Sequence, residues 1–139
     1  MNNRLFIIGA TAAVAVSVGL LVAHPGSAAP SGATSAQVAQ GKYLVTSMAG
    51  CMDCHGANLH GAPLPFKPLP VVKFPPGVHW APVAPNIVAL IHSGSAAKWA
   101  RFLQTGVDPN GKQANPPMPQ FRMKASDAQA VVAYIRSLR

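Results

Sequence analysis

The sequence predicts an all-α fold, in which three or four short helices and long proline-rich loops wrap around a bound group. Apolar residues recur at helical spacing in three separate stretches, and no alternating pattern is long enough to build a sheet. The 139 residues include 14 prolines and 12 glycines, so much of the chain is expected in turns. Aromatic residues make up only 6% of the chain, so something besides side chains should help to fill the core.

Residues 1–29 are predicted to be a secretory signal peptide, followed by one domain over residues 30–139. A positive charge at Arg4 precedes a 19-residue apolar run, a His-Pro-Gly helix breaker and the small residues Ser-Ala-Ala that end at Ala29. We favour cleavage after Ala29. The alternative is an uncleaved anchor, because the apolar run nearly spans a bilayer. Under both interpretations the rest of the chain lies outside the cytoplasm.

Three stretches are predicted to be helices. The first covers about residues 35–48, where one apolar stripe is formed by Gly41, Leu44, Val45 and Met48. A glycine within a helix costs about 1 kcal/mol relative to alanine, which suggests close approach of another helix at Gly41.

The other two predicted helices cover about residues 95–104 and 126–138. Ser95 is a suitable N-cap for the second helix and Gly106 a suitable C-terminal cap. The second helix is expected to bury Trp99, Phe102 and Leu103. Ser126 and Gln129 fit a capping box at the start of the third helix. Its apolar stripe consists of Ala128, Val131, Val132, Ile135 and Leu138.

A long connection, residues 56–94, is expected to be a loop. Eight prolines between Pro63 and Pro85 exclude a regular helix or a central strand there. Its apolar residues suggest a segment wrapped onto something apolar: Phe66, Val71, Val72, Phe74, Trp80, Ile87 and Leu90. A second loop, residues 107–121, contains a Pro-Pro-Met-Pro run centred on Met118.

The two cysteines of the chain lie in a Cys-Met-Asp-Cys-His sequence, in which Cys51, Cys54 and His55 have the spacing of a c-type haem attachment site. Two thiols three positions apart at a helix end can each form a thioether with one vinyl group of the same porphyrin. The adjoining imidazole then reaches the iron. The sequence therefore predicts one covalent haem c, with its iron bound by His55.

Other uses of these residues are conceivable. A structural disulfide or a thioredoxin-like redox pair suits an oxidising compartment, but it leaves His55 without a role and the chain offers no βαβ pattern. A zinc site would need further ligands at short spacing, and His60 is a poor fourth partner.

The second axial ligand is expected to be Met118. Prolines on both sides restrict the backbone and lack N–H groups, so the segment can present a thioether at little entropic cost. The alternatives are Met123, one of the histidines at 60, 79 and 92, or an open coordination site.

From residue 39 to residue 138 the chain resembles a monohaem class I cytochrome c of the bacterial periplasmic type. The resemblance rests on the cysteine–histidine motif, Gly41 in the Gly-Lys-Tyr-Leu-Val run, Pro85-Asn86-Ile87, Thr105-Gly106, the Met118 run and the apolar C-terminal helix. It implies the cytochrome c fold and a periplasmic location. It also implies that Gly41 packs against Tyr134 and that the Pro85 carbonyl orients the His55 ring.

The expected function is electron transfer by a haem that cycles between Fe(III) and Fe(II), by a carrier or the cytochrome subunit of an oxidoreductase rather than by an enzyme. The chain has no glutamate and only three aspartates, which argues against paired-carboxylate hydrolysis. It also lacks the glycine-rich loops of nucleotide-binding sites. The alternatives are peroxidase-like catalysis at a labile sixth coordination site and a module without redox cycling.

The expected partner is a redox protein with an acidic docking surface. The net charge is +8, or +7 once Arg4 is removed with the leader, and exposed lysines around a haem edge would attract such a partner. Candidate residues are Lys42, Lys67, Lys73, Lys98, Lys112 and Lys124. A merely soluble charged surface is the alternative. No nucleic acid or small-molecule substrate is expected, and membrane association only if the leader is retained.

Overall fold

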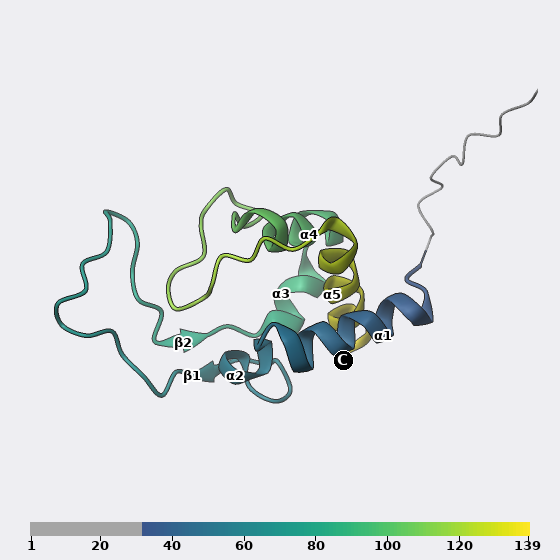
Figure 1. The fold of residues 1–139 in the computed structure, drawn as a ribbon, viewed down its shortest axis with the longest axis horizontal. Coiled ribbons are helices and arrows are strands. Elements are labelled where there is room, and N and C mark those ends of the chain that lie inside the picture. Colours follow the sequence, from purple (N-terminus) through teal and green to yellow (C-terminus); the bar gives the residue numbers. More distant parts are fainter. Residues whose placement is uncertain (1–31) are drawn as a thin grey trace, which may run out of the picture.

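The computed structural model describes residues 32–139, so the predicted leader and its cleavage site lie outside the described residues. This part of the chain is mostly helical, as the sequence predicts (Figure 1). Its helices are α1 (Ser35–Tyr43), a π-helical turn η1 (Leu44–Met48), α2 (Cys51–His55), α3 (Ile87–Ser93), α4 (Ala96–Thr105) and α5 (Ala125–Ser137). None of the helices in residues 32–139 is long and apolar enough to cross a membrane.

The first predicted helix is confirmed as α1 and η1 together. Thr34 caps it, because its hydroxyl accepts a hydrogen bond from the Gln37 N–H at 3.1 Å. Val45 is buried on the predicted stripe, whereas Met48 is 63% exposed and does not belong to the core. The wider π-helical turn begins after Tyr43 and has more residues per turn than the 3.6 of an α-helix, so the side chains after it depart from the predicted stripe and Met48 lies off the buried face.

The packing of α1 against α5 is the most extensive contact between helices, and Gly41 makes it possible. A Cβ atom at residue 41 would collide with the Ala130 carbonyl oxygen and would lie 2.8 Å from the Tyr134 Cβ. The predicted contact of Gly41 with Tyr134 is therefore confirmed. The free energy lost by placing glycine within a helix is offset by close approach of the two backbones.

The expectation of a loop throughout residues 56–94 is wrong for its last part, which forms α3. The prolines end at Pro85, and Asn86 caps the helix by accepting a hydrogen bond from the Ala89 N–H at 2.8 Å. Val88 and Ile91, three residues apart, are both buried. Local capping and one apolar face thus suffice for a two-turn helix directly after the proline-rich segment.

The remainder of that connection forms a lobe. Strands β1 (Ala62–Pro63) and β2 (Val83–Ala84) pair antiparallel, with Ala62 opposite Ala84, and the lobe consists of residues 64–82 between them. Within the lobe Trp80 contacts two phenylalanine rings, with ring centroids 5.8 Å from Phe66 and 6.4 Å from Phe74. Figure 1 shows the lobe extending away from the helices.

The last two helices agree with prediction except at one cap. Helix α4 has Ser95 as its N-cap residue and ends at Gly106 in the left-handed conformation. Helix α5 has Lys124 as its N-cap residue instead of Ser126, so the predicted capping box is wrong. The preceding residue donates its N–H to the Leu103 carbonyl at 3.1 Å, and this tertiary hydrogen bond fixes the chain so that the helix begins earlier.

One core lies between α5 and the other helices. It includes four of the five residues predicted for the α5 stripe; the fifth, Leu138, is half-buried against it. The buried cluster consists of Val45, Leu59, Val88, Ile91, Ala100, Leu103, Ala128, Val131, Val132 and Ile135. Trp99 and Phe102 were also expected to be buried, but they are only half-buried because they lie at the wall of a cavity described below.

Candidate functional site

Helix α2 consists of the cysteine–histidine motif alone, so one short rigid element positions all three side chains. The two thiols are not bonded to each other. The pKa of the Cys51 thiol is raised to about 11, mainly by burial and to a smaller extent by the nearby Asp53 and Cys54, against a lowering backbone hydrogen bond. Redox-active Cys-x-x-Cys pairs show the opposite shift, because their chemistry requires a thiolate at neutral pH. The environment of Cys51 therefore argues against a thioredoxin-like role.

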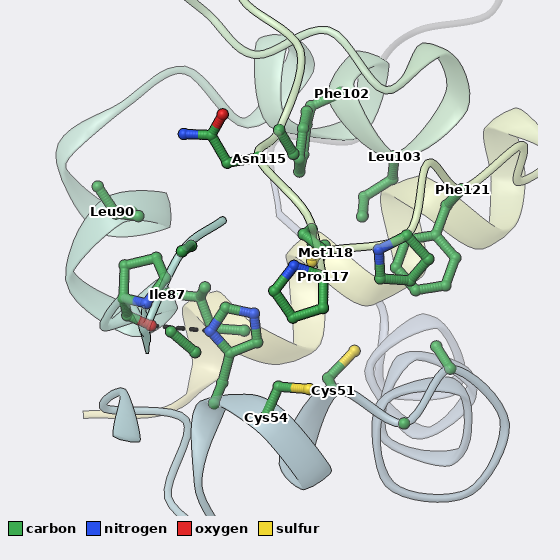
Figure 2. Close-up of a pocket in the computed structure, with 18 of the residues that line it drawn as sticks. Cys51, Cys54, Ile87, Leu90, Phe102, Leu103, Asn115, Pro117, Met118 and Phe121 are labelled. Carbon is green, nitrogen blue, oxygen red and sulfur yellow. Dashed lines mark hydrogen bonds between the residues drawn. The ribbon is translucent and has the colours of Figure 1, made fainter. Parts of the chain in front are cut away.

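His55 is the buried polar side chain of the described core, with 6% of its surface exposed. Its Nδ1 lies 2.8 Å from the Pro85 carbonyl oxygen, in the hydrogen bond drawn as a dashed line in Figure 2. A carbonyl oxygen can only accept, so Nδ1 carries the proton and donates it. Nε2 is then the unprotonated nitrogen with a free lone pair, the form in which imidazole binds metals.

The turn after α2 brings the two partners of that hydrogen bond together. Gly61 donates its N–H to the His55 carbonyl at 2.8 Å, and Ile87 donates to the Leu59 carbonyl at 3.1 Å. Gly61 has a φ of +94°, and a Cβ there would lie 2.6 Å from the Ala84 carbonyl oxygen. The absence of a side chain at residue 61 lets the segment that contains Pro85 lie directly against this turn.

A cavity of about 620 Å³ opens beside α2, and its volume lies within the ~300–1,000 Å³ range of ligand pockets. Cys51, Cys54 and His55 lie along one part of its wall. The rest is largely apolar and comes from β2, α3, α4, α5 and the loop before α5. Figure 2 shows Met118, Pro117 and Phe121 on that loop, across from the cysteines, with Leu103 nearby.

Of the candidate second ligands, the structure places Met118 in the cavity wall and half-buried. Met123 lies against the helical core instead. The histidines at 60, 79 and 92 are exposed, and none of them lines this cavity. The geometry therefore brings Met118 together with Cys51, Cys54 and His55.

Three hydrogen bonds hold the Met118 segment. The Met118 N–H donates to the Asn115 carbonyl at 3.1 Å, which closes a turn. The Ala81 N–H donates to the Pro116 carbonyl at 2.7 Å, and the His79 N–H donates to the Asn115 Oδ1 at 3.2 Å. The last two connect the end of the lobe to the loop that carries Met118.

In the comparison with protein families, residues 38–139 match the cytochrome c model. The chain belongs to the cytochrome c family. This confirms the resemblance to class I members and the cytochrome c fold, and with the motif of α2 it establishes one covalently bound haem c with iron as the cofactor. Neither the curated proteins nor the solved structures compared with the chain gave a significant match.

The residues around the cavity of this cytochrome fit a haem. Trp99 lines the cavity, and its buried indole N–H has no hydrogen-bond partner within the described part of the chain. A buried donor without an acceptor is costly, and a macrocycle with carboxylate side chains can supply one. Val83 and Leu90, which are 55% and 37% exposed, line the cavity, so the same group would cover the part of each side chain that faces it.

The sequence analysis missed some residues of the site. Leu90 and Ile91 line the cavity from α3, where a loop was expected; the apolar character of Ile87 and Leu90 was noticed, but the helix that presents them was not. Gly61 and Asn115 were not singled out. For α3 the Pro-Asn sequence before an apolar run was an available signal. The roles of Gly61 and Asn115 depend on contacts between distant segments, for which the sequence offered no signal.

Proposed function

We propose that this cytochrome is an exported one-electron carrier in which the iron is held between His55 and Met118. The thiols of Cys51 and Cys54 would form the two thioether bonds, and the Pro85 carbonyl would orient the His55 ring. The observation that carries the proposal is that these side chains, distant in sequence, line one apolar cavity. The bound haem supplies the one-electron chemistry, through its ferric and ferrous states.

The hydrogen bond from His55 to Pro85 would serve two purposes. It selects the tautomer that leaves Nε2 free for the axial bond, and it holds the ring in one orientation. A carbonyl acceptor on Nδ1–H also makes the imidazole a stronger electron donor. Both effects favour a stable axial bond that does not rearrange between redox states.

The segment around Met118 would supply the second axial ligand from a restrained backbone. The neighbouring prolines limit its conformations, and the hydrogen bonds from His79 and Ala81 fix its position. With both axial positions filled by protein, no coordination site is left for a substrate. This supports an electron carrier over peroxidase-like catalysis, which requires an open or labile site.

The expected location is the periplasm, with residues 1–29 removed during export, and the expected partner is a redox protein with an acidic surface. Two features of the sequence support this: the leader-like N-terminus and the excess of 11 basic over 3 acidic residues. All six candidate lysines are exposed, although they are spread over α1, α4, the lobe and the loop that carries Met118.

The test combines mass spectrometry of the mature protein with its absorption spectrum. The mass should show one added haem and the loss of residues 1–29, and the reduced protein should give the sharp α-band of a low-spin haem. Met118→Ala should abolish the low-spin spectrum and lower the midpoint potential by a substantial part of the roughly 0.8 V over which axial ligands set haem potentials. Met123→Ala is the matched control and should change neither.

Two results would contradict the proposal. A spectrum that survives Met118→Ala would mean that another residue is the ligand. Peroxidase turnover in the native protein at the rate of dedicated enzymes would mean that the sixth site is open, and the alternative function would then replace electron transfer.

A further inference from the structure

The lobe exposes an apolar surface. Leu69 and Val71 are 69% and 79% exposed, and Phe66 and Val72 are each 44% exposed. Monomeric proteins seldom expose several large apolar side chains within a few residues of one another unless the surface binds something. We call these four residues the lobe patch.

The haem does not account for the lobe patch. The exposed side chains of Val83 and Leu90 line the cavity, and a bound haem would cover them. None of the four residues of the lobe patch lines the cavity. Within residues 32–139 the patch therefore stays exposed when the haem is bound, which leaves it available to a different molecule.

An aromatic cluster packs within the lobe that carries this patch, and the base of the lobe adjoins the haem cavity. Within it, Trp80 packs against Phe66, which belongs to the patch, and against Phe74, and the Trp80 indole N–H is buried. At its base, Leu64 and Ala81 form part of the cavity wall. A partner bound to the lobe patch would thus contact a segment that joins the cavity wall at its base, and it would meet a surface whose prolines leave little conformational entropy to lose.

The charge around the patch indicates the chemistry of the partner. Lys67 lies between Phe66 and Leu69 in the sequence, Lys73 directly follows Val72, and both lysines are exposed. No acidic residue occurs between Asp53 and Asp108 in the sequence, so no carboxylate of the lobe neutralises these two lysines. An apolar centre with a basic rim complements an apolar surface with an acidic rim.

We propose that the lobe patch, with Lys67 and Lys73, is the docking surface for an acidic redox protein that exchanges electrons with the haem. This inference rests on the proposed function, because it assigns the site at which the electron carrier meets its partner. Brief contacts of this kind need only a small interface, below about 1,200 Å² in total, so a patch of four apolar residues and two lysines is sufficient.

A membrane surface fits the lobe less well. Segments that bind anionic lipid by charge usually contain about 4–8 Lys or Arg residues, whereas the lobe has two. The membrane interface also favours tryptophan with its polar edge toward water, but the Trp80 N–H is buried within the lobe. Binding to lipid is therefore an outcome that the experiment must exclude.

The test measures second-order rates of electron exchange between the holoprotein and two reagents at low ionic strength. One reagent is ferricyanide, which is small enough to reach the haem without docking. The other is an acidic blue-copper protein whose copper lies beneath an apolar face rimmed by carboxylates. Leu69→Ser/Val71→Ser should lower the rate with the copper protein about tenfold, equivalent to about 1.4 kcal/mol of binding, and should leave the ferricyanide rate unchanged. Tyr43→Ser removes an exposed apolar side chain from α1 and is the control that should change neither rate.

A second pair of variants separates the position of charge from its total. Lys67→Glu/Lys73→Glu should slow the exchange with the copper protein about tenfold or more and flatten its salt dependence. Lys42→Glu/Lys98→Glu changes the net charge by the same amount on α1 and α4, and it should have a much smaller effect. The circular dichroism spectrum of each variant establishes that the fold is retained.

Equal rates for the lobe variants and their controls would overturn the proposal. Binding of the native protein to vesicles of anionic phospholipid that is lost in Leu69→Ser/Val71→Ser, with unchanged rates to the copper protein, would assign the patch to a membrane and overturn it as well. Failure of the proposed function is a separate result, because it would appear in the native protein as peroxidase turnover or as the absence of the low-spin spectrum, whatever the lobe variants do.

Discussion

The loop that carries Met118 and the lobe between β1 and β2 are both rich in proline and in apolar side chains. In the first, Pro117, Met118 and Phe121 line the haem cavity. In the second, Leu69 and Val71 are exposed, and neither lines the cavity. Proline gives both segments an extended, restrained backbone, but it does not determine the direction of the side chains. The direction depends on whether an apolar surface lies close enough to pack against.

The lobe itself repeats this difference between its base and its tip. At the base, Leu64 and Ala81 form cavity wall, and Gly61, just before β1, contacts the segment that contains Pro85. At the tip, Val71 makes no part of that wall. We therefore expect the base to behave as part of the haem site, and the tip as a surface that can change without loss of stability.

Gly61→Ala should have the largest effect on stability. The φ of +94° disfavours alanine, and its Cβ would lie 2.6 Å from the Ala84 carbonyl oxygen, so strain and overpacking together should cost about 2–4 kcal/mol. The displaced segment contains Pro85, so the variant should also weaken the hydrogen bond to His55, make the imidazole a weaker electron donor and raise the midpoint potential. Guanidinium denaturation and redox titration of the holoprotein measure the two effects.

Gly77→Ala is the matched control for that variant. Gly77 has a φ of +80°, but nothing lies within 4 Å of the place where its Cβ would be. Gly77→Ala should lower the free energy of unfolding by only the roughly 1–2 kcal/mol that a left-handed backbone costs alanine. It should leave the midpoint potential unchanged. Equal effects of the two substitutions would show that the close approach of Gly61 to the segment with Pro85 contributes nothing to stability or to the midpoint potential.

Asn115→Ala should have an intermediate effect. It removes the acceptor for the His79 N–H, at a cost of about 0.5–1.5 kcal/mol, and it releases one of the connections between the lobe and the Met118 loop. The near-infrared absorbance of methionine-ligated ferric haem should therefore be lost at a lower denaturant concentration than in the native protein. Asn115→Asp keeps an acceptor oxygen and should restore most of the loss, while the exposed Gln113→Ala should have no effect.

Leu69→Ser should have the smallest effect, within about 0.5 kcal/mol, because this side chain is 69% exposed. The same substitution at Leu64, half-buried in the cavity wall, should cost about 1.5–3 kcal/mol and reduce haem retention. Thermal unfolding of the two variants provides the comparison. A destabilised Leu69→Ser would mean that the tip is packed like the base, and the distinction between them would be lost.

Local patterns predicted much of the fold. The stripe of α5, the two ends of α4 and the extent of α1 with η1 agree with the helical periodicity and the cap residues. The errors occurred where distant segments intervene. Helix α5 starts early because Met123 is hydrogen-bonded to Leu103, and Met48 leaves the core because a π-helical turn rotates it outward.

For the site, the sequence determined the chemistry: two thiols and an imidazole at fixed spacing can attach a haem, because covalent bonding and axial ligation depend on neighbours along the chain. Only the tertiary structure decided which other atoms surround that motif. The Pro85 carbonyl lies 30 residues from His55, and Asn115 lies 36 residues from its partner His79. Such contacts depend on how helices and loops pack in three dimensions. Local sequence patterns do not specify that packing, because they reflect only residues that are close along the chain.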